Sequence, residues 1–329
     1  MELNLTGNPK KSEGSGSEPL KVLVIGSGPA GLSAALYAAR AELNPLVLTG
    51  MELHGQAALT HVIENYPGFP DGVGGDELGD LFQKQAERFG AKVEFDTVEQ
   101  VDLSRRPFTI KTYNHVYQAE TVIVTTGATP NHLNVPGEVE LIGKGVSYCA
   151  TCDGWFFKNK KVVVVGGGDS ALEEGIFLTR YASSVTIIHR RDALRAGAIL
   201  QHRALDNPKI NLVVNTIVTE IVGKDAVKSV RLRDVKTGET SELTTDGVFI
   251  FVGHTPNTSL FKGQLTLDER GYIQTNVLME TNVPGVYAAG EASDPNYRQV
   301  VTSAGMGAAA AMQATHFLES QKEEATALV

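Results

Sequence analysis

Two short apolar runs in this 329-residue chain are each followed by a glycine-rich turn and then by a helical pattern of small residues. Leu20–Ile25 is almost entirely apolar, as is typical of a strand buried in a parallel sheet, and Lys161–Val165 has the same character. The spacing of apolar residues predicts helices over Leu32–Arg40 and Leu172–Tyr181. The pattern therefore predicts an α/β fold that contains the same strand–turn–helix unit twice.

The two turns have the spacing G-x-G-x-x-G/A. The first glycine allows a sharp turn, the second lets the backbone approach a pyrophosphate, and the third position lets helix and strand pack closely. The anion then lies at a helix N-terminus. One such turn could be an ordinary connection, but two predict two dinucleotide sites. The residues are Gly26, Gly28, Pro29, Ala30 and Gly31, and Gly166, Gly168, Asp169, Ser170 and Ala171.

The residues after the second strand of each unit indicate which dinucleotide binds. The predicted strand Val185–Ile188 ends at His189, Arg190 and Arg191, with Arg195 shortly after. An NAD site would carry an acid here, whereas cations suit a 2′-phosphate, so we expect NADPH. A solvated basic turn is the alternative, since Asp192 lies among the cations.

The first unit fits the pattern less closely. The predicted strand Pro45–Leu48 ends at Thr49 and Gly50, and the acid Glu52 comes late. We expect FAD here, because a flavin can accept the two electrons of NADPH and pass them to a disulfide.

The only cysteines, Cys149 and Cys152, stand close together. Closing so short a loop removes little chain entropy, so a redox role is favoured over a structural staple. An inert turn is the alternative, and zinc is disfavoured because no second pair of ligands has the right spacing. The adjacent Asp153 is expected to act as acid–base if burial raises its pKa; a turn or N-cap role is the alternative.

Charge and composition argue against two classes of protein, nucleic-acid-binding and membrane-spanning. The net charge of −9, with no basic stripe, argues against a nucleic-acid partner, and no apolar run is long enough for a membrane helix. Residues 1–19 are predicted to be a disordered tail and Gln321–Val329 a second loose end. The single thiol pair and the lack of an export signal favour the cytoplasm.

These motifs, in this order, resemble the low-molecular-weight thioredoxin reductases from Leu20 to about Leu318. The resemblance rests on Cys149–Gly154, Gly166–Ser170, His189–Asp192, Gly253–Thr258, and Tyr297–Gln299 with Thr302–Gly305. It implies two Rossmann-like dinucleotide-binding domains, in which an NADPH domain at 131–257, carrying the thiol pair, is inserted into a split FAD domain at 20–130 and 258–329. It also implies a homodimer, and thioredoxin or a thioredoxin-like dithiol protein as the partner.

The resemblance further implies hydride transfer from NADPH to FAD, reduction of the Cys149–Cys152 disulfide, and dithiol–disulfide exchange with oxidised thioredoxin. Cys152 would face the flavin, Cys149 would attack the partner's disulfide, and the inserted domain would rotate about its two connections. No metal is implied. The residues implied at the FAD site are Thr49, Gly50, Glu52, Gly55, Gln56, Asn65, Val98, Gly127, Gly290, Glu291, Arg298, Gln299 and Val300.

The chain departs from the family at two positions. Glu291 stands where the family usually has Asp, so its bond to the ribityl chain must be re-aimed. His54 stands where the family has Gly; we expect a solvent-facing imidazole there, and a partner surface or a changed flavin environment is the alternative.

Near the C-terminus, Val286–Glu291 is predicted to be a strand entering a turn, and Met306–Leu318 a helix. Trp155 and Phe156 either pack in the core or dock the partner. Two other functions stay open: an NADPH-dependent flavin diaphorase or ferredoxin reductase, which would not need Cys149, and a redox-sensing flavoprotein, which NADPH would reduce slowly.

Overall fold

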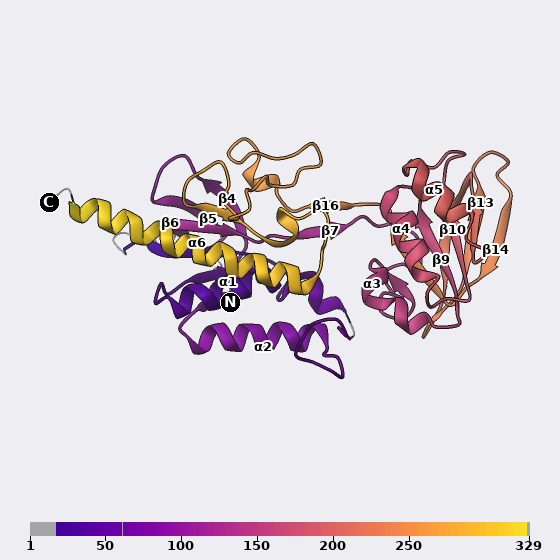
Figure 1. Cartoon of the computed structure of the whole chain (residues 1–329), viewed down its shortest axis with the longest axis horizontal. Helices are drawn as coiled ribbons and strands as arrows, with labels where there is room; N and C mark the ends of the chain where they lie inside the picture. The colour runs from indigo at the N-terminus through magenta and orange to yellow at the C-terminus, as the bar shows by residue number, and fades with distance from the viewer. Residues whose placement is uncertain (1–17, 61, 328–329) are drawn as a thin grey trace, which may run out of the picture. The chain divides into compact units, whose positions relative to one another are not determined.

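The computed structural model describes residues 18–60 and 62–327. The predicted N-terminal tail therefore lies almost entirely outside the described residues. The chain divides into two compact units (Figure 1). The first comprises the chain up to Val62 together with Tyr66–Ala128 and Pro256–Val329, and the second comprises Ile63–Asn65 and Thr129–Thr255.

The first unit is built on a seven-stranded sheet in the order β3-β2-β1-β6-β5-β4, with β17 also paired to β6. The strands β3, β2, β1, β6 and β17 run parallel, and β5 and β4 complete the sheet antiparallel. The elements are β1 (Leu20–Ile25), α1 (Pro29–Arg40), β2 (Leu46–Leu48), η1 (Gly55–Leu59), α2 (Gly75–Arg88), β3 (Lys92–Glu94), β4 (Val98–Asp102), β5 (Phe108–Thr112), β6 (Val116–Val124), η3 (Ser259–Phe261), β17 (Val286–Ala288), η4 (Gly290–Ala292) and α6 (Val300–Ala327).

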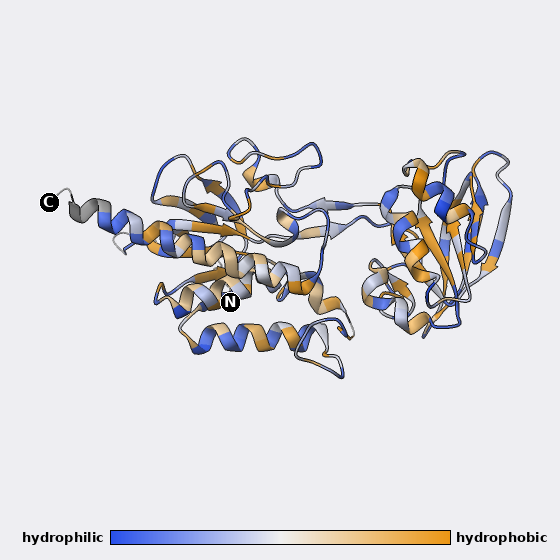
Figure 2. Ribbon diagram, in the orientation of Figure 1, coloured by the Kyte–Doolittle hydropathy of each residue, from blue (hydrophilic) through white to orange (hydrophobic). Residues whose placement is uncertain are grey.

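The second unit has a five-stranded parallel sheet in the order β11-β10-β9-β15-β8 and an antiparallel three-stranded sheet, β12-β13-β14. Apolar residues colour the central strands orange in Figure 2, because both faces of this sheet are covered. The elements are β8 (Val146–Ser147), α3 (Ala150–Asp153), η2 (Gly154–Phe157), β9 (Lys161–Gly166), α4 (Asp169–Leu178), β10 (Ser184–Ile188), α5 (Ala198–Leu205), β11 (Ile210–Val213), β12 (Thr216–Gly223), β13 (Val227–Asp234), β14 (Thr240–Thr244) and β15 (Gly247–Phe251).

Two short strands connect the units. β7 (Ala128–Pro130) and β16 (His254–Pro256) pair with each other as a separate two-stranded sheet. Each is preceded by a glycine at positive φ, Gly127 at 68° and Gly253 at 111°, a conformation that disfavours other residues. The division falls two residues before the expected positions 130/131 and 257/258, within this paired ribbon.

The predicted strands agree closely with the structure, while the helix ends differ. α1 and α4 begin at Pro29 and Asp169, directly after the glycine turns, and α4 ends at Leu178 rather than Tyr181. The C-terminal helix is much longer than predicted, so the expectation of a loose end from Gln321 is wrong as far as Ala327.

Small residues explain why α6 packs closely against α1. Ala310, Ala311 and Ala314 are fully buried in one cluster with alanines of α1, and a Cβ on Gly307 would lie 1.9 Å from the carbonyl oxygen of Ala30. Within residues 18–60 and 62–327, no helix has the length and apolar character needed to cross a membrane.

Candidate active site

In the first phosphate turn, the first and third glycines are packed against backbone, whereas the second has open space beside it. Gly26 has φ 114°, and a Cβ there would lie 2.4 Å from the carbonyl oxygen of Thr125. A Cβ on Gly31 would lie 1.9 Å from the carbonyl oxygen of Gly26, whereas one on Gly28 would meet nothing nearer than 3.9 Å. Gly28 begins α1 without a side-chain cap, so its first backbone N–H groups are available to an anion.

The second phosphate turn has the same plan. A Cβ on Gly166 would lie 2.5 Å from the carbonyl oxygen of Phe251, and Gly168 begins α4 without a side-chain cap. The carboxylate of Asp169 accepts a hydrogen bond from the N–H of Gly197 at 2.7 Å. Asp169 therefore ties the turn to the loop that carries the predicted cations.

Three arginines lie in the loop between β10 and α5. Arg190, Arg191 and Arg195 are exposed, and none forms an ion pair with the residues that the structure describes. The N–H of Arg195 donates to the carbonyl oxygen of Gly167 at 2.7 Å, which fixes it against the turn. This set suits a 2′-phosphate.

His189 differs from its predicted role as a fourth cation. It is 5% exposed, and a Cβ on Gly167 would lie only 2.2 Å from its Nδ1, so the ring packs beneath the turn. Burial lowers the pKa of His189, which keeps the imidazole neutral. Its Nε2 lies 3.1 Å from the carbonyl oxygen of Ala193, so the ring shapes the loop instead of adding charge.

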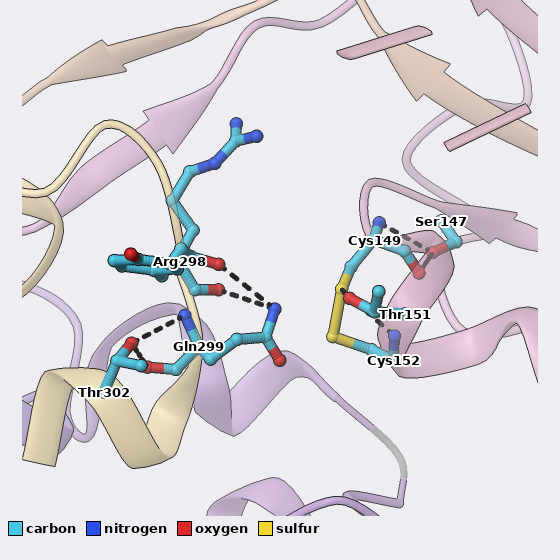
Figure 3. Close-up of a disulfide and its surroundings, with 8 residues drawn as sticks. Ser147, Cys149, Thr151, Cys152, Arg298, Gln299 and Thr302 are labelled. Carbon is cyan, nitrogen blue, oxygen red and sulfur yellow. Dashed lines mark hydrogen bonds between the residues drawn. A yellow bond between two sulfur atoms is a disulfide. The ribbon is translucent and has the colours of Figure 1, made fainter. Parts of the chain in front are cut away.

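The two cysteines form a disulfide at the start of α3 (Figure 3), with a Cα–Cα separation of 5.3 Å. The Cys149 sulfur accepts from the N–H of Cys152 at 3.2 Å and lies 3.3 Å from the Thr151 hydroxyl. Ser147 bonds both the N–H and the carbonyl oxygen of Cys149, at 3.1 Å each. The pair is therefore held by its own backbone. No group of three His, Cys, Asp or Glu able to hold a metal occurs in the described chain.

Asp153 lies in the last turn of α3. Burial raises the pKa of its carboxyl group, and a hydrogen bond from Ser147 offsets part of that shift. Its side chain does not cap the following η2, so the capping alternative fails. Of the three aromatic residues that follow, Trp155 and Phe156 are 51% and 42% exposed, whereas Phe157 is buried against Phe249.

The loop after β2 carries several predicted FAD residues. Thr49 is buried, and Gly50 has φ 75° and donates its N–H to the carbonyl oxygen of Asp96. Glu52 is exposed and accepts from Nε2 of Gln56 at 2.9 Å. A Cβ on Gly55 would lie 3.2 Å from Cα of Gly28, so this loop lies against the first phosphate turn.

The expectation for His54 is wrong: its side chain is 2% exposed. The ring lies against α2, with Nδ1 3.1 Å from Asp76 Oδ1 and Nε2 3.1 Å from Gln83 Oε1. No local pattern signals this burial, because the space for the ring comes from Gly79, more than twenty residues away.

The segment after β17 contains another set of residues predicted at the FAD site. Gly290 has φ 69°, and a Cβ there would lie 2.9 Å from Cβ of Ala30, which places it against the first phosphate turn. Burial raises the pKa of Glu291 to about 7; Arg298 lowers it and Asp294 raises it. Gln299 bonds Thr302 in the first turn of α6, which begins at Val300 (Figure 3).

Three further residues were predicted at the FAD site: Asn65, Val98 and Gly127. Asn65 is in an exposed loop, and Gly127 has open space around it. The Val98 side chain is in the hydrophobic core, which leaves only its backbone for binding.

The residues present fit the two cofactors. The first turn offers uncapped helix N–H groups, an open second glycine and no side-chain charge, as a flavin dinucleotide requires. The second adds exposed guanidinium groups, as NADPH requires.

Comparison with known proteins agrees with this arrangement. Residues 20–307 match the family Pyridine nucleotide-disulphide oxidoreductase. The thioredoxin reductase of Rickettsia bellii is 52% identical over 91% of this chain and 98% of its own length, and that of Streptomyces coelicolor is 50% identical over 94% and 97%. The crystal structure of thioredoxin reductase from Streptococcus pyogenes is 42% identical, with a TM-score of 0.88 over 92% of this chain and 98% of its own.

The chain therefore belongs to the pyridine nucleotide-disulphide oxidoreductases, a family whose thioredoxin reductases use FAD and NADPH. Within that family it belongs to the thioredoxin reductases, and the resemblance that the sequence predicted is confirmed.

Proposed function

We propose that this chain catalyses thioredoxin-disulfide reduction, with Cys149 and Cys152 as the redox centre and Asp153 as the proton donor. The observation that carries the proposal is the Cys149–Cys152 disulfide next to a buried carboxyl group of raised pKa. The first unit holds FAD and the second holds NADPH. Bound FAD supplies the two-electron transfer that links a nicotinamide to a disulfide.

The surroundings of Cys149 suit a nucleophile. Once the pair is reduced, the N–H of Cys152 and the hydroxyl of Thr151 stabilise a thiolate on the Cys149 sulfur. That thiolate attacks one sulfur of the thioredoxin disulfide and displaces the other as a thiolate, which takes a proton. Cys152 then attacks Cys149 in the mixed disulfide, which restores the internal disulfide and releases reduced thioredoxin.

Asp153 supplies that proton. Because burial raises the pKa of its carboxyl group, Asp153 retains its proton to a higher pH than an exposed aspartate does. A neutral acid beside the thiols can protonate the leaving thiolate and recover the proton afterwards.

Trp155 and Phe156 support thioredoxin as the partner. They follow the redox pair and are half exposed, and aromatic side chains of this kind act as anchors at protein interfaces. The FAD contacts proposed are the glycines of the first turn, the residues from Thr49 to Gln56, Asn65, Val98, Gly127, Gly290, Glu291 and Arg298 to Val300. We also propose a homodimer located in the cytoplasm, as the resemblance implies.

The test is an anaerobic stopped-flow record of the flavin spectrum of the holoenzyme, mixed with NADPH and then with oxidised thioredoxin. We expect rapid bleaching and rapid reoxidation in the wild type. With Cys149→Ser we expect bleaching to persist while reoxidation by thioredoxin slows at least about 1000-fold, because the attacking thiolate is absent. Reoxidation that survives this substitution would favour a flavin diaphorase, and no bleaching would overturn the NADPH assignment.

A further inference from the structure

The departure at His54 places a buried imidazole behind the first phosphate turn. Its backbone has φ 61°, a left-handed conformation that favours glycine, the family's usual residue here. A histidine is retained in this conformation while its side chain is 2% exposed. Such a residue must gain enough from its surroundings to offset the backbone strain.

Helix α2 provides those surroundings. Asp76, Gly79 and Gln83 are spaced three and four residues apart, so they lie on one face of the helix. The ring nitrogens contact the first and last of them at 3.1 Å. A Cβ on Gly79 would lie 2.4 Å from Cβ and Cγ of His54. The missing side chain at Gly79 therefore forms a notch that accommodates the imidazole.

Both ring nitrogens of His54 have a hydrogen-bonding partner on α2. The Asp76 carboxylate can only accept, so it requires a proton on Nδ1. Gln83 turns its oxygen toward Nε2 because its own amide nitrogen donates to Glu87 at 2.8 Å. The ring is thus held at both nitrogens by side chains of α2.

The other charged groups around the ring are accounted for. On α2, Asp80 is paired with Lys84 and interacts with His54 through space, and Glu87 accepts from Gln83. In the same loop as His54, the Glu52 carboxylate accepts from Gln56. The first phosphate turn, residues 26–31, contains no titratable side chain. Asp76 is thus the one carboxylate that contacts the ring directly among the described residues.

The backbone of His54 contacts the phosphate turn itself. Its N–H donates to the hydroxyl of Ser27 at 3.2 Å, and Ser27 is 2% exposed. The carbonyl oxygen of His54 is the atom nearest to a Cβ on Gly28, at 3.9 Å. One residue thus contacts helix α2 through its ring and the turn through its backbone.

We propose that His54 is a positioning residue for FAD: its imidazole, seated in the Gly79 notch, holds the loop that supports the Gly26–Gly28 turn. The inference rests on the proposed function, since it takes that turn to bind FAD. Loss of the ring's contacts with α2 would loosen the loop, so FAD would leave faster.

The test measures the rate at which FAD leaves the holoenzyme, followed by the rise in flavin fluorescence, in the wild type, Gly79→Ala, His54→Gly and the double variant. The added methyl group displaces the ring, so Gly79→Ala should speed release about tenfold in the wild type. In the His54→Gly background the same change should alter it less than about twofold, because no ring remains to be displaced. Equal effects in both backgrounds would overturn the proposal.

A second test uses a substitution at an exposed position, which does not disturb the core. Asp76 is 82% exposed, so Asp76→Asn should fold normally and speed FAD release about threefold. Glu77→Gln, exposed in the same first turn of α2, is the matched control and should change nothing.

The outcomes separate this inference from the proposed function. A wild-type protein that holds no FAD would overturn both. A holoenzyme that reduces thioredoxin but shows no coupling between His54 and Gly79 would overturn only the role of His54. A purely structural role would lower the melting temperature of the FAD-free protein without changing the rate of FAD release.

Discussion

The two phosphate turns follow one plan but differ in what surrounds them. The first contains no charge, is closed by Gly31 against the carbonyl oxygen of Gly26, and is supported by the buried His54. The second has Ala171 in place of the third glycine and faces exposed guanidinium groups. Buried backbone contacts suit a cofactor that stays bound, whereas exposed charges suit one that arrives and leaves in each cycle.

The largest effect should come from closing the first turn. In Gly31→Ala the new Cβ would lie 1.9 Å from the carbonyl oxygen of Gly26 and must displace it. We expect FAD affinity to fall at least about 100-fold. The matched change in the second turn, Ala171→Gly, should alter the KM for NADPH less than about threefold. Flavin absorbance of the purified protein would measure the loss of FAD, and steady-state kinetics would measure the KM for NADPH. Comparable losses in the two variants would show that the two turns do not differ in this way.

A smaller effect should come from removing charge at the second turn. The double substitution Arg190→Gln with Arg191→Gln removes two cations that we assign to the 2′-phosphate. We expect the preference for NADPH over NADH to fall about 30-fold, because each charge-assisted bond is lost only for the phosphorylated cofactor. Arg180→Gln, at the opposite end of α4, is the control. An unchanged ratio of kcat/KM for the two cofactors would show that the basic turn is only solvated.

The smallest effect concerns Glu291 beside the first turn. Burial raises its pKa from 4.5 to about 7, so the folded protein keeps a proton that the unfolded chain releases near pH 4.5. The stability of the FAD-free protein should therefore decline as pH rises from 4.5 to 7 and stay low above it. Glu291→Gln should remove the decline and be more stable by about 1–2 kcal/mol at about pH 8.

Urea unfolding at several pH values would check this, with exposed Glu269→Gln as the control. If the wild type and the Glu291→Gln variant lose stability in parallel as the pH rises, the Glu291 carboxyl group is not desolvated.

Local patterns predicted much of the fold. The strand Leu20–Ile25 and the start of the strand at Lys161 agree with the structure, because a run of buried residues next to a glycine turn determines both its length and its end. The length of α6 was underestimated because Gly305 and Gly307 weaken the helical pattern of the sequence. Packing on α1 nevertheless requires a small residue at Gly307.

Long-range packing could not be predicted in the same way. His54 is buried because Gly79 leaves space, and His189 is neutral because it packs beneath Gly167. Neither pairing follows from periodicity, since the partners are far apart in sequence. The redox pair was predictable because both sulfurs belong to one short segment.

The short separation of the two cysteines also determines how much the fold depends on their disulfide. Cys149 and Cys152 are three residues apart, so opening their bond frees almost no additional chain conformations. The hydrogen bonds of Ser147 to the Cys149 backbone do not depend on the sulfur–sulfur bond. The oxidised and reduced proteins should therefore melt at nearly the same temperature. Each catalytic cycle opens and closes the disulfide without destabilising the fold.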